Sequence, residues 1–204
     1  MLRHILIIIQ LFGTSLLMSQ GFQAGFSVGM NASQIDGDLF SGYNKPGIRA
    51  GFLVSYQIRD RFKIGLELAY NELGSQKKLI VGSSSPEEQR KIQLNYLSFP
   101  IFAQIQPKSR LNWLSSLNFK FGLENSYMIK SKIQDRDDEE ILEYFNNWNL
   151  GLLLGVIYEI NERIGLEFRI NESANLIFNN DKIQQFNSNS LRNRYITFML
   201  KYLL

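Results

Sequence analysis

The pattern that decides the fold stands at residues 148–170, WNLGLLLGVIYEINERIGLEFRI. Apolar side chains occupy every second position from Trp148 to Ile160, and the same alternation resumes at Ile164 after a short polar turn. Side chains of a strand point alternately to its two faces, so a period of two indicates a strand with one continuous apolar face. The segment therefore predicts two strands joined as a hairpin.

The same alternation recurs along most of the remaining chain. It predicts further strands over residues 22–33, 48–58, 62–70, 92–105, 111–123 and 196–204. The connections alternate in length, with short turns at 59–61, 107–110 and 161–163 and long polar stretches at 36–47, 72–91, 130–147 and 179–191. No stretch has a helical period of convincing length, and no linker divides the chain. We therefore expect one all-β domain, residues 21–204, that forms an eight-stranded antiparallel up-and-down barrel.

One predicted strand, 92–105, changes its parity along its length. Its apolar positions begin with Ile92, Leu94 and Tyr96, whereas near Pro100 they change to Phe99 and Ile101. A β-bulge at the proline would keep all of these residues on a single face. We therefore expect a bulge there, with Leu94 and Tyr96 on the apolar face of the strand.

The first twenty residues have the three parts of a secretory signal. A positive start at Arg3 is followed by an apolar run that ends at Met18, and the small residue Ser19 comes next. This run is shorter and more interrupted than the about 20 apolar residues that a membrane-spanning helix needs. We expect residues 1–20 to be a signal peptide that is removed.

Composition excludes several classes of chemistry. The 204 residues contain no cysteine, which removes disulfide frameworks, thiolate nucleophiles and cysteine zinc sites. His4 is the only histidine, so removal of the signal would leave none for a Ser-His-Asp triad. The formal charge of +3 is spread along the chain and forms no basic patch for nucleic acid. We therefore expect a protein that is not an enzyme, has no catalytic, cofactor or metal site, and binds no nucleic acid.

The face opposite the apolar one decides between two kinds of barrel. A secreted lipocalin-like barrel binding an apolar ligand turns its apolar face inward, whereas an outer-membrane barrel turns it toward lipid. The opposite face carries many of the fifteen glycines, which would pack nothing on a surface exposed to water. Inside a narrow barrel they leave room for long charged side chains that pair with one another. We therefore expect a structural charged network in the interior, formed by Arg49, Lys63, Glu67, Lys120, Glu124, Glu159, Glu167, Arg169 and Lys201.

Aromatic residues and connection lengths favour the outer-membrane barrel. Aromatic side chains lie near the predicted strand ends, at Tyr56 and Trp113 by the short turns and at Tyr96 and Trp148 by the long stretches. They match the two girdles found at lipid interfaces, and outer-membrane barrels have short periplasmic turns and long extracellular loops. We therefore expect a barrel surrounded by outer-membrane lipid of a Gram-negative cell, with both termini in the periplasm. The secreted lipocalin-like barrel is one alternative, and an outer-membrane enzyme that works at the lipid surface with carboxylate and serine groups is another.

Three segments carry a family resemblance: Phe26-Ser27-Val28-Gly29-Met30-Asn31, Leu94-Asn95-Tyr96-Leu97-Ser98-Phe99-Pro100 and Leu150-Gly151-Leu152-Leu153-Leu154-Gly155. They resemble the PorT-like outer-membrane β-barrel proteins of the Bacteroidetes, and the resemblance extends over essentially the whole mature chain. It implies the same fold and location. The family's name comes from a member linked to protein secretion and gliding, so a secretion-associated outer-membrane component is a further alternative.

The long polar stretches are where such a barrel would carry its variable function. The acidic run at 135–140 offers oxygen ligands for a hard cation but lacks the spacing of a calcium loop, which favours a solvated surface. We expect a monomer with a structural role or a loop-mediated interaction role, its unknown protein partner meeting the extracellular loops. An eight-stranded barrel is nearly filled by side chains, so we expect the charged network to fill the interior and leave no open pore.

Overall fold

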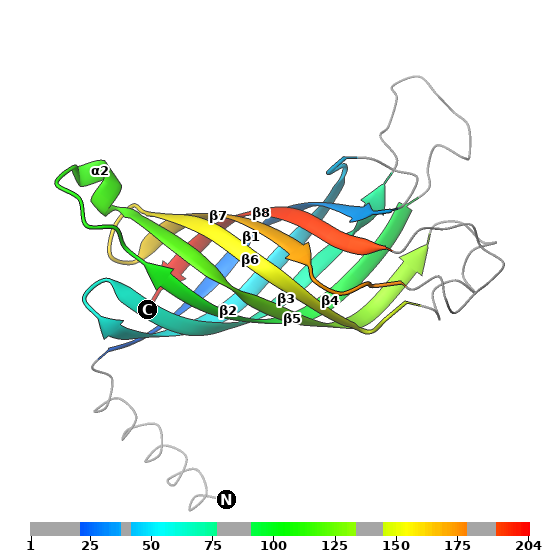
Figure 1. Ribbon diagram of the computed structural model, residues 1–204, viewed down its shortest axis with the longest axis horizontal. Coiled ribbons are helices and arrows are strands. Elements are labelled where there is room, and N and C mark those ends of the chain that lie inside the picture. Colours follow the sequence, from blue (N-terminus) through cyan, green and yellow to red (C-terminus); the bar gives the residue numbers. More distant parts are fainter. Residues whose placement is uncertain (1–20, 38–41, 77–90, 134–144, 179–190) are drawn as a thin grey trace, which may run out of the picture.

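A computed structural model describes residues 21–37, 42–76, 91–133, 145–178 and 191–204. Within these ranges the chain forms eight strands and one short helix: β1 (Phe22–Asp36), β2 (Lys45–Arg59), β3 (Phe62–Gln76), β4 (Lys91–Ile105), α2 (Asn112–Ser115), β5 (Leu117–Ile133), β6 (Trp148–Glu159), β7 (Ile164–Ser173) and β8 (Arg192–Leu203). Each strand pairs antiparallel with its sequence neighbour and β1 also pairs with β8, so the sheet closes into a barrel (Figure 1). The expected antiparallel up-and-down barrel is confirmed. The predicted signal peptide, residues 1–20, lies outside the described residues.

The barrel has two different ends, which we name by their connections. The short-turn end carries two short turns, 60–61 and 160–163, and the longer connection 106–116, together with the start of β1 and the end of β8 (Figure 1). The long-loop end carries connections 37–44, 77–90, 134–147 and 174–191. Both termini of the barrel therefore lie at the short-turn end, where the backbone N–H of Leu204 donates to the carbonyl of Ala24.

The connection 106–116 is longer than the sequence predicts. We expected a turn at 107–110 and a strand from Leu111, but α2 occupies this segment and β5 begins at Leu117. Trp113 lies on α2 and is 61% exposed, so it is not part of a strand face. The alternation of Leu111 and Trp113 breaks at Ser115, and two apolar residues are too few to establish a strand, which explains the error. Within the described ranges, no helix is both long and apolar enough to cross a membrane.

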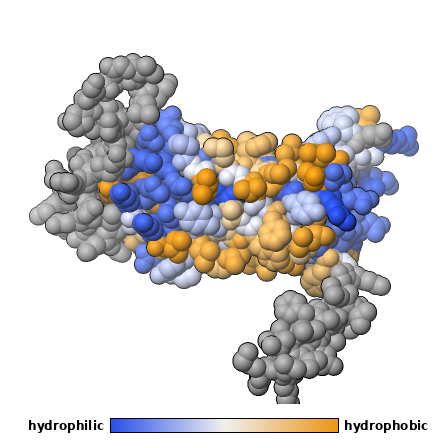
Figure 2. Space-filling view, turned by 180° about the vertical axis from the view of Figure 1, so that it is seen from behind, coloured by the Kyte–Doolittle hydropathy of each residue, from blue (hydrophilic) through white to orange (hydrophobic). Residues whose placement is uncertain are grey.

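Outward side chains form an apolar belt around the middle of the barrel. Val28 and Leu154 are 59% and 64% exposed although both are aliphatic. The belt forms a hydrophobic zone between hydrophilic zones at the two ends (Figure 2). A contiguous exposed apolar surface of this kind marks contact with a partner or a membrane. This arrangement is the reverse of a lipocalin-like barrel, which would hold its apolar face inside.

Aromatic residues lie at both margins of the belt. Phe22 and Tyr56 pack with ring centroids 4.8 Å apart near the short-turn end, and Tyr127 and Trp148 pack at 5.0 Å near the long-loop end. Aromatic side chains at these levels form the two girdles of a transmembrane barrel. Tyr96, which we expected in a girdle, instead lies inside the barrel with no exposed surface.

The expected change of parity in β4 does not occur. Leu94, Tyr96 and Phe102 are all buried, so the even-numbered positions of β4 face the interior on both sides of Pro100. The irregularity lies between β4 and β5, where Ile129 of β5 is an extra residue in the pairing. The prediction was wrong because it assigned every apolar residue to the lipid face, whereas apolar side chains also pack in the interior at the long-loop end.

Candidate functional site: the barrel interior

Six charged side chains from four strands meet at the middle of the interior. We name them the central charge cluster: Arg49 of β2, Glu67 of β3, Lys120 and Glu124 of β5, and Glu167 and Arg169 of β7. None is more than 3% exposed. Each occupies an inward position because the alternation that sends apolar neighbours to the belt sends these residues inside.

The two arginines join the carboxylates of different strands. Arg49 lies 3.1 Å from Glu67 and 3.1 Å from Glu124. Arg169 lies 2.9 Å from Glu67 and 2.7 Å from Glu167. Glu67 therefore accepts from both guanidinium groups, and the cluster connects β2, β3, β5 and β7 across the interior. A planar guanidinium with several donors suits this bridging role better than an ammonium group.

Glu124 is the most heavily hydrogen-bonded carboxylate of the cluster. It accepts from both terminal nitrogens of Arg49 at 3.1 Å each. The side-chain amides of Asn71 and Asn171 donate to it at 3.2 and 3.1 Å, and the hydroxyl of Tyr195 donates at 2.5 Å. A carboxylate so surrounded keeps its charge stabilised without water.

Lys120 completes the cluster from β5. Its ammonium donates to the two oxygens of Glu167 at 3.0 and 3.2 Å and lies 4.0 Å from the centre of the Phe102 ring. Gly65 makes room for that ring, because a Cβ at this position would lie 2.6 Å from Phe102 Cζ. With three cations and three anions the central charge cluster is neutral as a unit, which buried charges require.

The other three residues of the predicted network lie nearer the short-turn end. Lys201 is 3.9 Å from Glu167, at the margin of the cluster. Lys63 donates instead to Gln23 at 2.9 Å, and Glu159 lies at the last position of β6. The structure therefore brings six of the nine predicted residues together, places Lys201 beside them, and leaves Lys63 and Glu159 outside the cluster.

The sequence analysis predicted the charged residues of the interior but not its neutral polar residues. Asn31 donates to Asn71 at 2.6 Å and accepts from Thr197 at 2.8 Å, while Ser173 donates to Asn149 at 2.7 Å. These residues occupy the same alternate, inward-facing positions of their strands as the charged residues. Their positions in the sequence could therefore have identified them. Asn193, whose sequence surroundings suggest a loop tip, is 1% exposed and donates to the hydroxyl of Tyr96.

Apolar side chains close the interior at the long-loop end. We name this group the apolar plug: Ile35, Leu73, Leu94, Tyr96, Met128, Phe145, Ile177, Phe178, Leu191 and Tyr195. Phe145 and Phe178, from two connections, pack with ring centroids 5.3 Å apart, and Phe178 forms a bridge with Leu191. The plug separates the central charge cluster from this end of the barrel.

Replacing Phe178 with alanine is expected to open the plug locally. Phe178 is 2% exposed and packs its ring against Phe145 of the other connection, so its removal leaves a cavity that neighbouring residues fill only partly. We expect amide exchange at Ile177 and Leu191 to accelerate at least about tenfold, while Val28 in the middle of β1 keeps its rate. Hydrogen exchange followed by NMR measures both, and equal rates at the plug in the two proteins would contradict this role.

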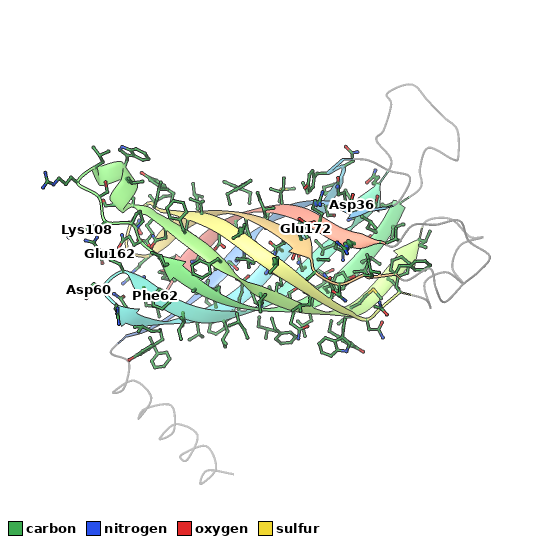
Figure 3. The ribbon with its side chains drawn as sticks, in the orientation of Figure 1. Asp36, Asp60, Phe62, Lys108, Glu162 and Glu172 are labelled. Carbon is green, nitrogen blue, oxygen red and sulfur yellow. The ribbon has the colours of Figure 1, made fainter. Side chains whose placement is uncertain are left out.

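Charged pairs lie at the rim of the long-loop end, where the strands meet the long connections beyond the apolar belt. Arg194 lies 2.6 Å from Glu172 and 3.7 Å from Asp36, and Figure 3 shows these two acids at this end. Lys45, inside the same rim, lies 2.7 Å from Glu72. The pairs of Arg194 are partly exposed to water, so each contributes little to stability.

No metal site follows from the described part of the chain. Within those ranges, no three His, Cys, Asp or Glu side chains are grouped so that they could hold a metal ion. The acidic run at 135–140 lies outside the described residues, which leave out 134–144.

Comparison with known proteins identifies a family and a set of similar barrels. A family model described as "Outer membrane protein beta-barrel domain" matches residues 18–179. Ail, the attachment invasion locus protein of Yersinia pestis, solved with the heparin analogue sucrose octasulfate, is 9% identical, with 90% of this chain and 99% of that chain covered and a TM-score of 0.47. Neisserial surface protein A is 12% identical, with 89% and 95% covered and a TM-score of 0.45. The E. coli outer membrane protein W is 13% identical, with 89% and 98% covered and a TM-score of 0.38. A search of curated proteins found no match.

Proposed function

Because the chain belongs to the outer membrane protein beta-barrel domain family, and is therefore a small outer-membrane barrel, we propose that it is a closed, non-enzymatic barrel that presents its long loops to partners. The proposal rests on one observation, the opposite character of the outer and inner faces of the barrel wall. The belt turns aliphatic side chains such as Leu154 outward, while the charges of the central charge cluster pair inside. The wall serves as a stable scaffold, and the connections carry the binding function.

We propose that the short-turn end faces the periplasm and the long-loop end faces outward. Outer-membrane barrels have their short turns in the periplasm, and both barrel termini share the short-turn end here. A signal peptide over residues 1–20, removed on export, agrees with this direction. The proposed surface for a protein partner is then the long-loop end of a monomeric barrel.

Protease treatment of intact cells tests the orientation. Peptide tags inserted within 77–90 and 134–147 should be cleaved from outside, and a tag after Leu204 should be protected until the outer membrane is broken. Recovery of the protein in the outer-membrane fraction is the accompanying control. Protection of both loop tags together with cleavage of the C-terminal tag would refute the proposed orientation.

The barrel is expected to conduct no ions. The central charge cluster crosses the interior, and the apolar plug closes one side of it. Purified protein in a planar lipid bilayer should therefore give no stable single-channel openings. Regular openings of a uniform conductance from folded protein would contradict a closed barrel.

A finer family assignment is also a proposal. The Asn95-Tyr96-Leu97-Ser98-Phe99-Pro100 segment supports membership of the PorT-like group, and its inward residues include Tyr96 of the apolar plug. A role in protein secretion is the alternative that this membership would suggest. Deletion of the gene followed by comparison of the secreted proteins tests it, and an unchanged set would reject the alternative.

A further inference from the structure

The short-turn end of the barrel opens into a polar cavity that the central charge cluster does not use. The cavity has a volume of about 210 Å³ and is lined by Asp60, Arg61, Lys63, Asn118, Glu159 and three glutamines. We name it the mouth cup. Its residues come from β2 to β6, from the turn between β2 and β3, and from the start of connection 106–116, and Figure 3 shows Asp60 at this end. Phe102 and Ile157, both buried, occupy the interior beyond these strand ends.

Asn118 is a buried donor without a partner at this cavity. It is 3% exposed, and its side-chain nitrogen has no hydrogen-bond partner among the described residues. A buried amide left unpaired costs free energy, so such a group in a native structure calls for a partner that the protein alone does not supply. Asn118 lines the mouth cup, but its side-chain nitrogen is itself buried, so the side chain must rotate before a molecule held there can accept its hydrogen bond.

The charges of the mouth cup are balanced in sign. Arg61 and Lys63 supply two cations, and Asp60 and Glu159 supply two anions. A ligand with a single charge would meet a like charge as well as an opposite one, which disfavours binding. A zwitterion can satisfy both signs, and the amide side chains can donate to and accept from a peptide group. A cavity of about 210 Å³ suits a small molecule rather than a folded domain.

We propose that the mouth cup binds a small zwitterion of the amino-acid or short-peptide class. Its carboxylate would meet Lys63, Arg61 and, after rotation of the side chain, the amide nitrogen of Asn118, and its ammonium would meet Glu159 and Asp60. The inference depends on the proposed orientation only for the source of the ligand, which would be the periplasm. Binding to purified protein does not depend on orientation, because both ends of a barrel in a detergent micelle are accessible.

Titration of labelled protein with matched probes tests the proposal. Glycylglycine is the zwitterion, N-acetylglycylglycine lacks the ammonium, glycylglycinamide lacks the carboxylate, and glucose is a neutral polyol. We expect saturable shifts of the Asn118 side-chain amide signals in NMR spectra with glycylglycine. Each capped dipeptide loses a charge-assisted contact and should bind about tenfold more weakly.

Variants at the two charges separate binding from a change of fold. Glu159→Gln and Lys63→Gln should each weaken glycylglycine about tenfold, while Glu172→Gln, at the opposite end, should leave binding unchanged. The backbone amide spectrum reports whether each variant keeps the barrel. Absence of saturation with glycylglycine, equal binding of glucose, or insensitivity to both mouth substitutions would overturn the proposal.

Discussion

Glu124→Ala is expected to lower the free energy of unfolding by about 3–5 kcal/mol, the cost of breaking a buried ion pair by removing one partner. The substitution leaves the central charge cluster with an excess cation, and Arg49 loses two hydrogen bonds. Asn71, Asn171 and Tyr195 lose their acceptor as well. Urea unfolding of the protein in lipid vesicles, followed by tryptophan fluorescence, measures the loss.

Glu172→Ala is the matched control, because it removes the same atoms from an ion pair at the rim. The Glu172 side chain is 50% exposed, so we expect a loss below about 1 kcal/mol. If Glu124→Ala fails to fold, Glu124→Gln removes the charge but keeps a side chain of the same shape, and its loss should exceed that of Glu172→Gln. Equal losses at the two sites would mean that the central charge cluster does not stabilise the barrel.

Alternation of apolar residues was enough to predict the barrel. A period of two records which residues share a face, and the long hairpin at 148–170 shows it plainly. The same parity located Arg49, Glu67, Lys120, Glu124, Glu167 and Arg169 on the inward face, where the structure brings them together. Charged residues at regular inward positions are recognisable because they would be costly on a lipid face.

The apolar plug could not be predicted in the same way. Leu94 and Tyr96 resemble lipid-facing residues because they are apolar and alternate with other residues. Alternation shows which residues share a face of a strand but does not show which face is inside. Phe178 reaches the plug from a connection, so no strand period reports it. The partner of Lys63 also depends on which side chains meet across the interior. Closure of the barrel, rather than local sequence, sets the distances between those side chains.

Leu154→Arg is expected to lower the free energy of unfolding in lipid by about 2–4 kcal/mol, the cost of an arginine on the lipid face near the bilayer midplane. Leu154 is 64% exposed and lies on β6, opposite Phe121 of β5 and Ile170 of β7 in the pairing. Its neighbours along the outward face are apolar in both directions, so the guanidinium has no polar partner within the belt. Urea titration in vesicles measures the change.

Ile160→Arg is the control that separates depth in the membrane from the substitution itself. Ile160 is 53% exposed and follows the end of β6 at the short-turn end, where the side chain of arginine can reach water. The same charge should therefore cost no more than about 1 kcal/mol there, because the penalty falls toward the interfaces. A large loss at position 154 with a small loss at 160 follows only if the belt contacts hydrocarbon. Equal small losses at both positions would mean that water, not lipid, surrounds the belt.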